Sequence, residues 1–405
     1  MAGYDFLKGV VVVEVAQLGM DSLGGYLADM GARVIKVEQP VRGDPVRYTG
    51  EYAIGSPDGV GLLHLRWNRG KESIALDYSS PRGAELFLKL SAKADIVIDG
   101  LKGGSLERRG LGYDTLAKKN PALVYCTISG LGTWGPYHRL RSHATAYDAY
   151  AGLLDGKTDQ PPGRGEFKSP PVGMNAPGLY AGIGVLSALV RAGATGKGAR
   201  LEVTGIDAAA NFVPEIVDCH LNSGTCFDRR AFHDATGRMR NWPRLWNYET
   251  ADGRLLHLQV FAPKTWEKFC RALDREDLLE LPVGKPDDAT YNQTLLVEIS
   301  AIVRQRTLTA WMAFFVAHDI SAMPLNDVAD LASDETFQSR RAWYEKEMPG
   351  VGMLRLTGTP IHVEGADFAP ELAPELGEHT ENVLSELLEL SPFQIGQFRR
   401  SGAIA

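Results

Sequence analysis

Val10-Val11-Val12-Val13-Glu14-Val15 is a run of mostly β-branched residues, long enough for one buried strand. Leu23, Leu27 and Met30 follow at helical spacing, and Gly31 is expected to end that helix. Val34-Ile35-Lys36-Val37 then predicts a second strand. Two strands joined by a helix form a βαβ unit, in which the strands are parallel and the crossover is right-handed.

The same alternation continues through the first third of the chain. Ser80-Pro81 predicts a helix start, with serine as the N-cap and proline in the first turn, and this helix runs through Leu90. Residues 96–98 and 123–128 predict further strands. The pattern predicts an α/β fold with a parallel sheet covered by helices on both faces.

The first βαβ unit invites comparison with dinucleotide-binding folds. Glu38 ends the second predicted strand, where such folds place the acidic residue that holds a ribose. However, Gln17-Leu18-Gly19-Met20-Asp21 lacks the G-x-G-x-x-G pattern. The residues favour a Rossmann-like framework that binds a nucleotide-bearing ligand other than a nicotinamide or flavin dinucleotide.

The chain length of 405 residues favours two domains. Residues 152–176 are rich in Gly, Pro, Lys and Asp and predict a loop, and residues 178–192 predict an apolar helix. Residues 246–260 alternate apolar and polar side chains around Asp252-Gly253, which predicts a hairpin.

Helices are expected after this hairpin, at 264–274, 294–304 and 308–317, and complete a smaller α+β domain. We therefore predict that residues 1–222 form the first part of the large domain. Residues 223–324 form the small domain with its linkers, and residues 325–405 are helices and loops that return to the large domain.

Composition excludes several classes of function. The net charge is −7 and no run of Lys or Arg occurs, so a nucleic-acid partner is not expected. No apolar stretch approaches the roughly 20 residues that span a bilayer, and the N-terminus lacks a signal-peptide pattern, so we expect no membrane partner and a cytoplasmic location. The four cysteines contain no C-x-x-C pair and match no standard zinc module, so no metal site is predicted.

Several segments, taken in order, carry a family pattern. They are Gly31-Ala32-Arg33-Val34-Ile35-Lys36-Val37-Glu38-Gln39-Pro40, Asn68-Arg69-Gly70-Lys71-Glu72-Ser73, Arg108-Arg109-Gly110-Leu111-Gly112, Ile128-Ser129-Gly130-Leu131-Gly132 and Ala373-Pro374-Glu375-Leu376-Gly377. The ordered set resembles the family III (CaiB/BaiF-type) CoA-transferases, which also include the α-methylacyl-CoA racemases. The resemblance covers nearly the whole chain.

The resemblance implies a Rossmann-like large domain, a small domain, and two chains interlocked as rings. It also implies that coenzyme A (CoA) binds at the large domain as part of the substrate, with no further cofactor. Lys71 and Arg108 would lie near the CoA phosphates. The adenine and ribose site would be lined by Gln39, Trp67, Gly100 and Leu101, and Asn68 would be a further CoA-binding residue.

Asn175 stands where the family's transferases carry a nucleophilic aspartate. In those enzymes the carboxylate attacks the acyl-CoA and is released again later, because a carboxylate is both a nucleophile and a leaving group. A carboxamide cannot form the anhydride, so this chain alone is expected to be inactive.

Three explanations of Asn175 remain open. The chain is a non-catalytic subunit paired with a paralogue that keeps the aspartate, or an engineered trap for an acyl-CoA complex, or an enzyme that uses another residue. The nearby carboxylates are Asp148, Glu166 and Asp207.

The leading hypothesis is a subunit of a CoA-transferase that moves CoA between an acyl-CoA donor such as succinyl-CoA and a carboxylic acid. Among the family's heteromeric members, succinyl-CoA:(R)-benzylsuccinate CoA-transferase is one candidate. One alternative is an acyl-CoA racemase-like enzyme in which His143 moves the α proton. The other is a CoA-binding scaffold or regulatory subunit; a homodimer is the alternative to a paralogous partner.

Overall fold

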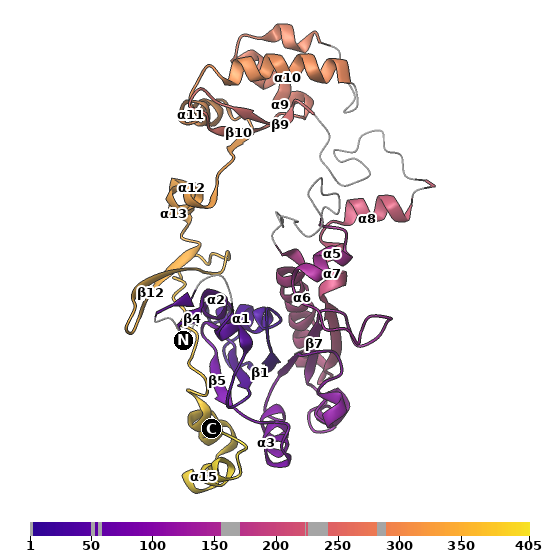
Figure 1. The fold of residues 1–405 in the computed structure, drawn as a ribbon, viewed down its shortest axis with the longest axis vertical. Coiled ribbons are helices and arrows are strands. Elements are labelled where there is room, and N and C mark those ends of the chain that lie inside the picture. The colour runs from indigo at the N-terminus through magenta and orange to yellow at the C-terminus, as the bar shows by residue number, and fades with distance from the viewer. Residues whose placement is uncertain are drawn as a thin grey trace, which may run out of the picture. The chain divides into compact units, whose positions relative to one another are not determined.

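The computed structural model describes residues 3–49, 53–55, 59–154, 171–222, 224–225, 242–281 and 289–405 (Figure 1). The chain divides into two compact units: residues 1–214 with 342–405, and residues 215–341. The boundaries predicted from the sequence lie at 222–223 and 324–325 instead. Two helices, α12 (Val328–Ser333) and α13 (Glu335–Arg340), lie between the second predicted boundary and the observed one. Neither helix buries a residue, so no apolar pattern marks the boundary.

The first unit is built on a six-stranded sheet whose order is β5-β2-β1-β6-β7-β8, with all neighbours parallel. The strands are β1 (Val11–Ala16), β2 (Arg33–Glu38), β5 (Glu72–Ala75), β6 (Ile96–Gly100), β7 (Val124–Ser129) and β8 (Ala199–Thr204). Counted along the chain, this is the order 3-2-1-4-5-6 of a Rossmann-like sheet. The strand order reverses between β1 and β6, which confirms the predicted fold and defines the topological switch point.

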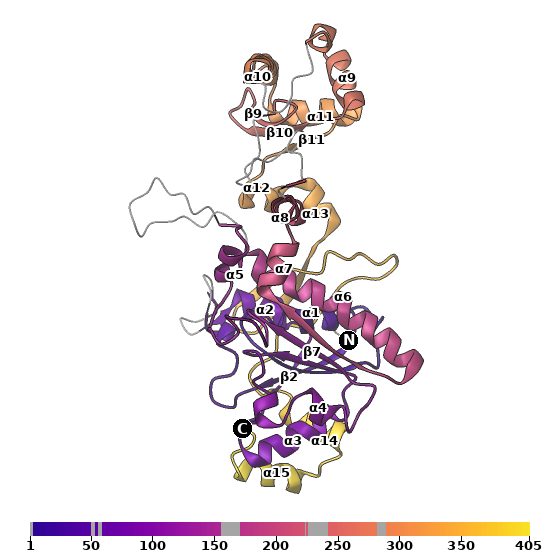
Figure 2. The same cartoon turned by 90° about the vertical axis from the view of Figure 1, so that its right-hand side faces the viewer.

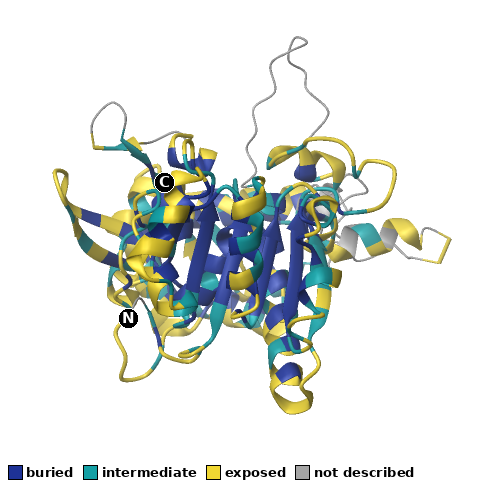
Figure 3. Cartoon of the chain, turned by 90° about the horizontal axis from the view of Figure 1, so that it is seen from below, coloured by how far each residue is buried: buried dark blue, intermediate teal, exposed yellow. Residues whose placement is uncertain are grey.

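Helices cover both faces of this sheet (Figure 2), and the strands between them are buried (Figure 3). Val13 of β1 packs in a core with side chains of α3 (Pro81–Ser91), α14 (Thr380–Leu388) and α15 (Pro392–Arg400). Val12 packs on the other face with α1 (Ser22–Asp29) and α6 (Val172–Thr195). Because successive strand residues point to opposite faces, a continuous valine run serves both cores.

The predicted start of α3 is confirmed, since the Ser80 hydroxyl accepts from the Gly83 N–H at 3.1 Å. The unit also contains short elements around the sheet. They are η1 (Pro45–Arg47), β3 (Ala53–Ile54), β4 (Val60–Gly61), α2 (Leu62–Asn68), η2 (Glu107–Arg109), α4 (Tyr113–Leu116), α5 (Thr145–Tyr150) and α7 (Gly205–Asn211). The next helix, α8 (Pro214–Leu221), belongs to the second unit except for its first residue.

Helix α6 differs from its prediction in two ways. It begins at Val172 rather than 178, so Asn175 lies in its first turns and Pro177 lies inside the helix. By length and composition it is also apolar enough to cross a membrane, contrary to the expectation of no such stretch. One face of α6 nevertheless packs on the sheet and on α1, where Ala181, Val185 and Ala188 are buried.

The second unit is the predicted small α+β domain. β9 (Leu245–Glu249) and β10 (Leu255–Gln259) form the expected antiparallel hairpin, and Gly253 has the positive φ of 73° that its turn requires. β11 (Ala322–Pro324) completes the sheet on the other side of β10. The core beside it comes from α9 (Pro263–Ala272), η4 (Glu276–Leu279), α10 (Ala289–Val303) and α11 (Leu308–His318).

The C-terminal segment returns to the first unit, as predicted. The His379 N–H donates to the Ser73 carbonyl of β5 at 2.9 Å, and Val383 and Phe398 join the core beneath the sheet. The expectation of helices and loops alone is wrong, because β12 (Trp343–Met348) and β13 (Gly352–Thr357) form an antiparallel hairpin. The sequence signal for this hairpin is weak, because only Leu354-Arg355-Leu356 of β13 alternates, whereas β12 contains three consecutive charged residues at 345–347.

Candidate active site

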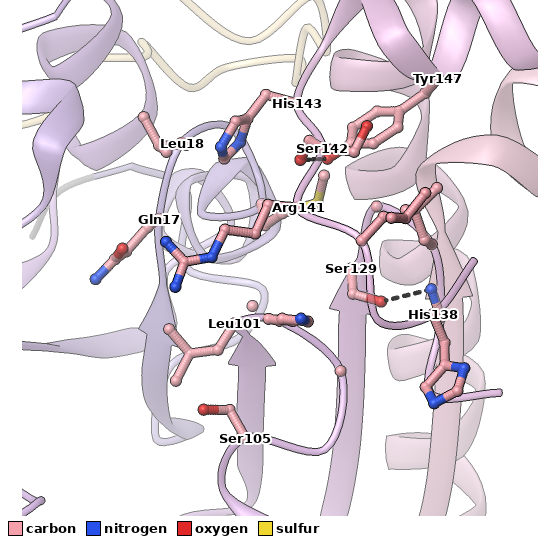
Figure 4. A pocket seen from close by; sticks show the side chains of 18 of the residues that line it. Gln17, Leu18, Leu101, Ser105, Ser129, His138, Arg141, Ser142, His143 and Tyr147 are labelled. Carbon is pink, nitrogen blue, oxygen red and sulfur yellow. Dashed lines mark hydrogen bonds between the residues drawn. The ribbon is translucent and has the colours of Figure 1, made fainter.

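A cavity of about 580 Å³ opens at the carboxyl ends of the strands around the switch point (Figure 4). Parallel α/β sheets bind ligands at this place, because the chain leaves adjacent strands in opposite directions there. The lining residues end or follow β1, β6 and β7, or belong to the segment before α5 and to α5 itself. They are Gln17, Leu18, Met20, Gly100, Leu101, Lys102, Gly103, Ser105, Arg108, Arg109, Ser129, Gly130, Leu131, Gly132, His138, Leu140, Arg141, Ser142, His143 and Tyr147.

The cavity is strongly cationic. Lys102, Arg108, Arg109 and Arg141 line it, and no acidic residue in the described part of the chain does. Arg108 donates to the Gly103 carbonyl at 3.2 Å, and Arg109 donates to the carbonyl and hydroxyl of Ser105 at 2.9 Å. These bonds are to neutral oxygens, so the positive charges stay available to a polyanionic ligand.

Four of the residues predicted from the resemblance line this cavity: Gly100, Leu101, Arg108 and His143. Gly100 is required by packing, because a Cβ there would lie 2.3 Å from the Ala16 Cβ of the neighbouring strand. His143 is exposed, and Figure 4 shows its ring beside Leu18 on the side of the cavity opposite Ser105.

Four other predicted binding residues do not line the cavity. Trp67, Asn68 and Lys71 are buried, and Gln39 is half-buried after β2. The Lys71 ammonium donates to Glu14 at 2.6 Å, to the Asp21 carbonyl at 2.7 Å and to Asn68 at 2.9 Å. An ammonium has three N–H donors, so Lys71 has none left for a phosphate in this structure.

Asn175 is exposed near the start of α6, and its amide donates to the Pro171 carbonyl at 2.9 Å. Pro171 is the N-cap and offers no side-chain acceptor. Instead, the Gly173 N–H donates to the Asp148 carboxylate at 2.7 Å. The Asp148 carboxylate of α5 thus satisfies an N–H group at the helix start, which explains why α6 begins before Pro177. The local sequence alone does not indicate this start.

The first turn of α6 lies against the β1–α1 turn that lines the cavity. A Cβ on Gly19 would lie 2.8 Å from Met174 Cγ. Position 175 therefore belongs to the surroundings of the cavity, although it is not among the lining residues.

The three alternative carboxylates have different surroundings. Asp148 is buried and holds the α6 turn, while Asp207 accepts from the Thr204 hydroxyl at 2.7 Å at the start of α7. Glu166 lies outside the described residues. Within the described ranges, no group of three or more His, Cys, Asp or Glu side chains is placed to hold a metal ion.

Beneath the cavity, Asp99 is the penultimate residue of β6, next to Gly100. Its carboxylate accepts from the Tyr125 hydroxyl at 3.0 Å and from the Leu101 N–H at 3.3 Å. Burial and, to a smaller extent, the negative charge of the nearby Glu107 raise the pKa of the Asp99 carboxyl to about 7. The floor of the site therefore contains a group that changes charge near neutral pH.

Most lining residues were not predicted, notably Gln17, Lys102, Arg109 and Arg141. The sequence did contain a signal for some of these lining residues. In such folds, the residues directly after the strands that flank a switch point face the ligand. Gln17 follows β1, and Lys102 and Arg109 follow β6. The segment 138–143 gave no comparable signal, since only the folded chain brings it over β7.

Comparison with known proteins now assigns the family. Residues 7–380 match the profile of CoA-transferase family III. The chain belongs to this family. It is 29% identical to the alpha subunit of the succinyl-CoA–L-malate CoA-transferase of Chloroflexus aurantiacus, over 97% of this chain and 91% of the relative. It is also 29% identical to the beta subunit, over 98% of each.

A solved structure has the same fold. The crystal structure of a CaiB/BaiF family protein from Brucella suis superposes with a TM-score of 0.75 at 28% identity, covering 96% of this chain and all of that one. The cavity at the switch point therefore lies in the sheet-containing unit of a family III CoA-transferase fold.

Proposed function

We propose that this chain is one subunit of a family III CoA-transferase composed of two related chains. It moves CoA between a dicarboxylic acyl-CoA, such as succinyl-CoA, and a carboxylic acid. The observation that carries this proposal is the cationic cavity at the switch point. Lys102, Arg108 and Arg109 match the phosphate groups of CoA, and Arg141 adds a fourth cation from the segment before α5.

The chemistry is acyl transfer through an aspartate of the partner chain. The carboxylate attacks the thioester and expels CoA as a thiolate, giving a mixed anhydride. The thiolate then attacks the enzyme carbonyl, which releases the donor acid and leaves an aspartyl-CoA thioester. The acceptor carboxylate and the thiolate repeat these steps in reverse order, so the reaction needs neither a metal nor an electron carrier.

Asn175 supports a division of labour between two chains. Its amide nitrogen is delocalised into the carbonyl, so it cannot serve as the nucleophile, yet its exposed position in α6 is compatible with a role beside the substrate. The relatives described above include both an alpha and a beta subunit, each similar to this chain along nearly its full length. A paralogous subunit is therefore the partner that we propose.

The exposed face of α6 supports an interface close to position 175. Leu179, Ile183, Leu186 and Val190 are exposed apolar residues at spacings of four, three and four, so they form one stripe. Asn175 precedes Leu179 by four residues and lies on the same side of the helix. A partner chain that covers this stripe also closes over residue 175.

The decisive experiment compares four preparations with succinyl-CoA and a set of carboxylic acids. We expect no CoA transfer by the chain alone, transfer by its complex with the copurifying paralogue, and gain of transfer in Asn175→Asp. Asn175→Ala, which also lacks a nucleophile, is the matched control and stays inactive. Full activity of the unmodified chain without a partner contradicts the two-chain proposal.

A second function is favoured by one observation, the placement of His143 in the cavity wall. In that case the chain would be racemase-like, and the histidine would exchange the α proton of an acyl-CoA. Deuterium uptake at the α carbon without CoA transfer, lost in His143→Ala, would support it. CoA binding with neither reaction, in the presence or absence of a partner, would support a scaffold instead.

A further inference from the structure

A buried ionic cluster lies beneath the β1–α1 turn, the turn that brings Gln17, Leu18 and Met20 to the cavity. Its central members are Asp21, Lys36 and Lys71, which are at most 3% exposed. Glu14, Asp44 and Asn68 surround them and are equally buried. Charged groups at this depth are costly unless each is paired, so their contacts explain why they are tolerated.

The two lysines hold both ends of the turn. Lys36 donates to the Ala16 carbonyl at 2.9 Å, to Asp21 at 3.2 Å and to Asp44 at 2.8 Å. Lys71 donates to the Asp21 carbonyl at 2.7 Å and to Glu14. Ala16 precedes the turn and Asp21 ends it, so backbone oxygens on either side of residues 17–20 are fixed by buried ammonium groups.

Asp21 also fixes the turn from inside. One carboxylate oxygen accepts from the Gly19 N–H at 3.0 Å, and the other accepts from Asn68 at 2.9 Å and from Lys36. Leu18 has a positive φ of 53°, which is unfavourable for a branched side chain. A turn with this backbone persists only when its surroundings impose it, and Asp21 supplies the direct contact.

The charges of Asp21 and Lys36 are maintained by their partners, whereas burial raises the pKa of Glu14 and of Asp44 and lowers the pKa of Lys71. Burial opposes ionisation of Asp21, but the ammonium groups of Lys36 and Lys71 outweigh it and hold the pKa of Asp21 below its ordinary value. Burial likewise opposes the charge on Lys36, but Asp21 and Asp44 raise the pKa of this lysine above its ordinary value. Buried ion pairs add little net stability compared with apolar packing, so a role in geometry is the better account of them.

We propose that Asp21, clamped by Lys36 and Lys71, is a positioning residue that holds the β1–α1 turn in the conformation that binds the ligand. The identity of that ligand as CoA rests on the proposed function. In this account Lys71 acts on the site through the turn rather than by contact with a phosphate.

The test replaces Asp21 by asparagine. The new amide N–H groups face Lys36 and Asn68, which are themselves donors, so the side chain must rotate and lose its bond to Gly19. Asn68→Ala, an uncharged change that removes one bond to Asp21, is the milder second variant. Asp29→Asn is the matched control, because Asp29 is also buried and paired, with Arg69, at the far end of α1.

Two measurements are made on the full chain, or on its complex where a partner copurifies. Hydrogen–deuterium exchange of peptides spanning residues 14–21, without ligand, reports the turn itself. Isothermal titration calorimetry with CoA reports its affinity. We expect faster exchange and an increase in Kd of about tenfold, equivalent to about 1.4 kcal/mol, in Asp21→Asn, with smaller changes of both in Asn68→Ala and neither in Asp29→Asn.

The outcomes separate this inference from the proposed function. Unchanged exchange in folded Asp21→Asn and Asn68→Ala overturns the inference, as does faster exchange with unchanged CoA affinity. If Asp21→Asn does not fold, hydrogen–deuterium exchange and CoA affinity of Asn68→Ala test the inference on their own. Failure of the unmodified protein to bind CoA overturns the proposed function, and the exchange data then still decide whether Asp21 holds the turn.

Discussion

At the scale of single residues, Asp99 makes stability depend on pH. Its folded pKa of about 7 lies above the usual value of about 3.9 for an unfolded chain, so the folded protein binds more protons between these values. Stability contributed by the neutral carboxyl is therefore lost as pH rises through this range, by up to about 4 kcal/mol. We expect Asp99→Asn, whose amide can keep both neighbours bonded, to show a flatter decline in urea denaturation between pH 5 and pH 8. Parallel curves for the two proteins would contradict this account.

Three of the seven CoA-binding residues implied by the resemblance line the cavity, and four do not. Gly100 ends β6, and Leu101 and Arg108 follow it, so these three lie at the carboxyl end of a strand, where such folds bind ligands. Lys71 precedes β5, two strands from the switch point, and its charge is satisfied within the protein. A sequence shows that a lysine is present but not how many carboxylates surround it, so a buried ion cluster cannot be distinguished from a phosphate site.

At the scale of elements, α6 has two faces with different partners. Ala181 and Val185 pack on the sheet, whereas Ile183 and Val190 are 67% and 75% exposed. We expect Ile183→Glu with Val190→Lys to convert a two-chain assembly into single chains in light scattering, with little change in the thermal unfolding of the unit. The control is Phe393→Glu on α15, which is 68% exposed and lies away from this stripe. A mass that stays unchanged in the double variant would exclude α6 from the interface.

The first residue of α6 could not be predicted from the local sequence. Pro177 is expected near a helix start, because it lacks an N–H and is accepted most easily in the first turn. The helix extends back to Val172 because Asp148 of α5 accepts from Gly173. That contact joins residues 25 positions apart, so the segment around Asn175 looked like a loop in sequence.

At the scale of the whole molecule, the parallel sheet and the return of the C-terminal segment to the first unit were predicted from the sequence, whereas the order of the strands is known from the structure. A repeated βαβ pattern with right-handed crossovers leaves few possible sheets. The hairpin in the small unit was marked by alternation around Asp252-Gly253. The exact boundary between the units near residue 341 could not be predicted from the sequence, because helices α12 and α13 bury no residue and carry no apolar pattern.

The separate cores of the two units predict separate unfolding. Core residues of the second unit lie between Tyr248 and Ala322, whereas Val383, Leu384, Ile395 and Phe398 complete the first. Deleting residues 380–405 removes these four side chains, each worth about 1.5–3 kcal/mol, which is comparable to the entire stability of a domain. Calorimetry of the full chain should show two transitions, and the truncated chain should lose the one that belongs to the first unit and keep the other. The same deletion also removes bonds that cover the edge strand β5, because the Ala75 N–H donates to the Thr380 hydroxyl at 3.0 Å and the Ala405 N–H donates to the Ala75 carbonyl at 3.4 Å. Loss of both transitions together in the truncated chain would show that the units fold as one.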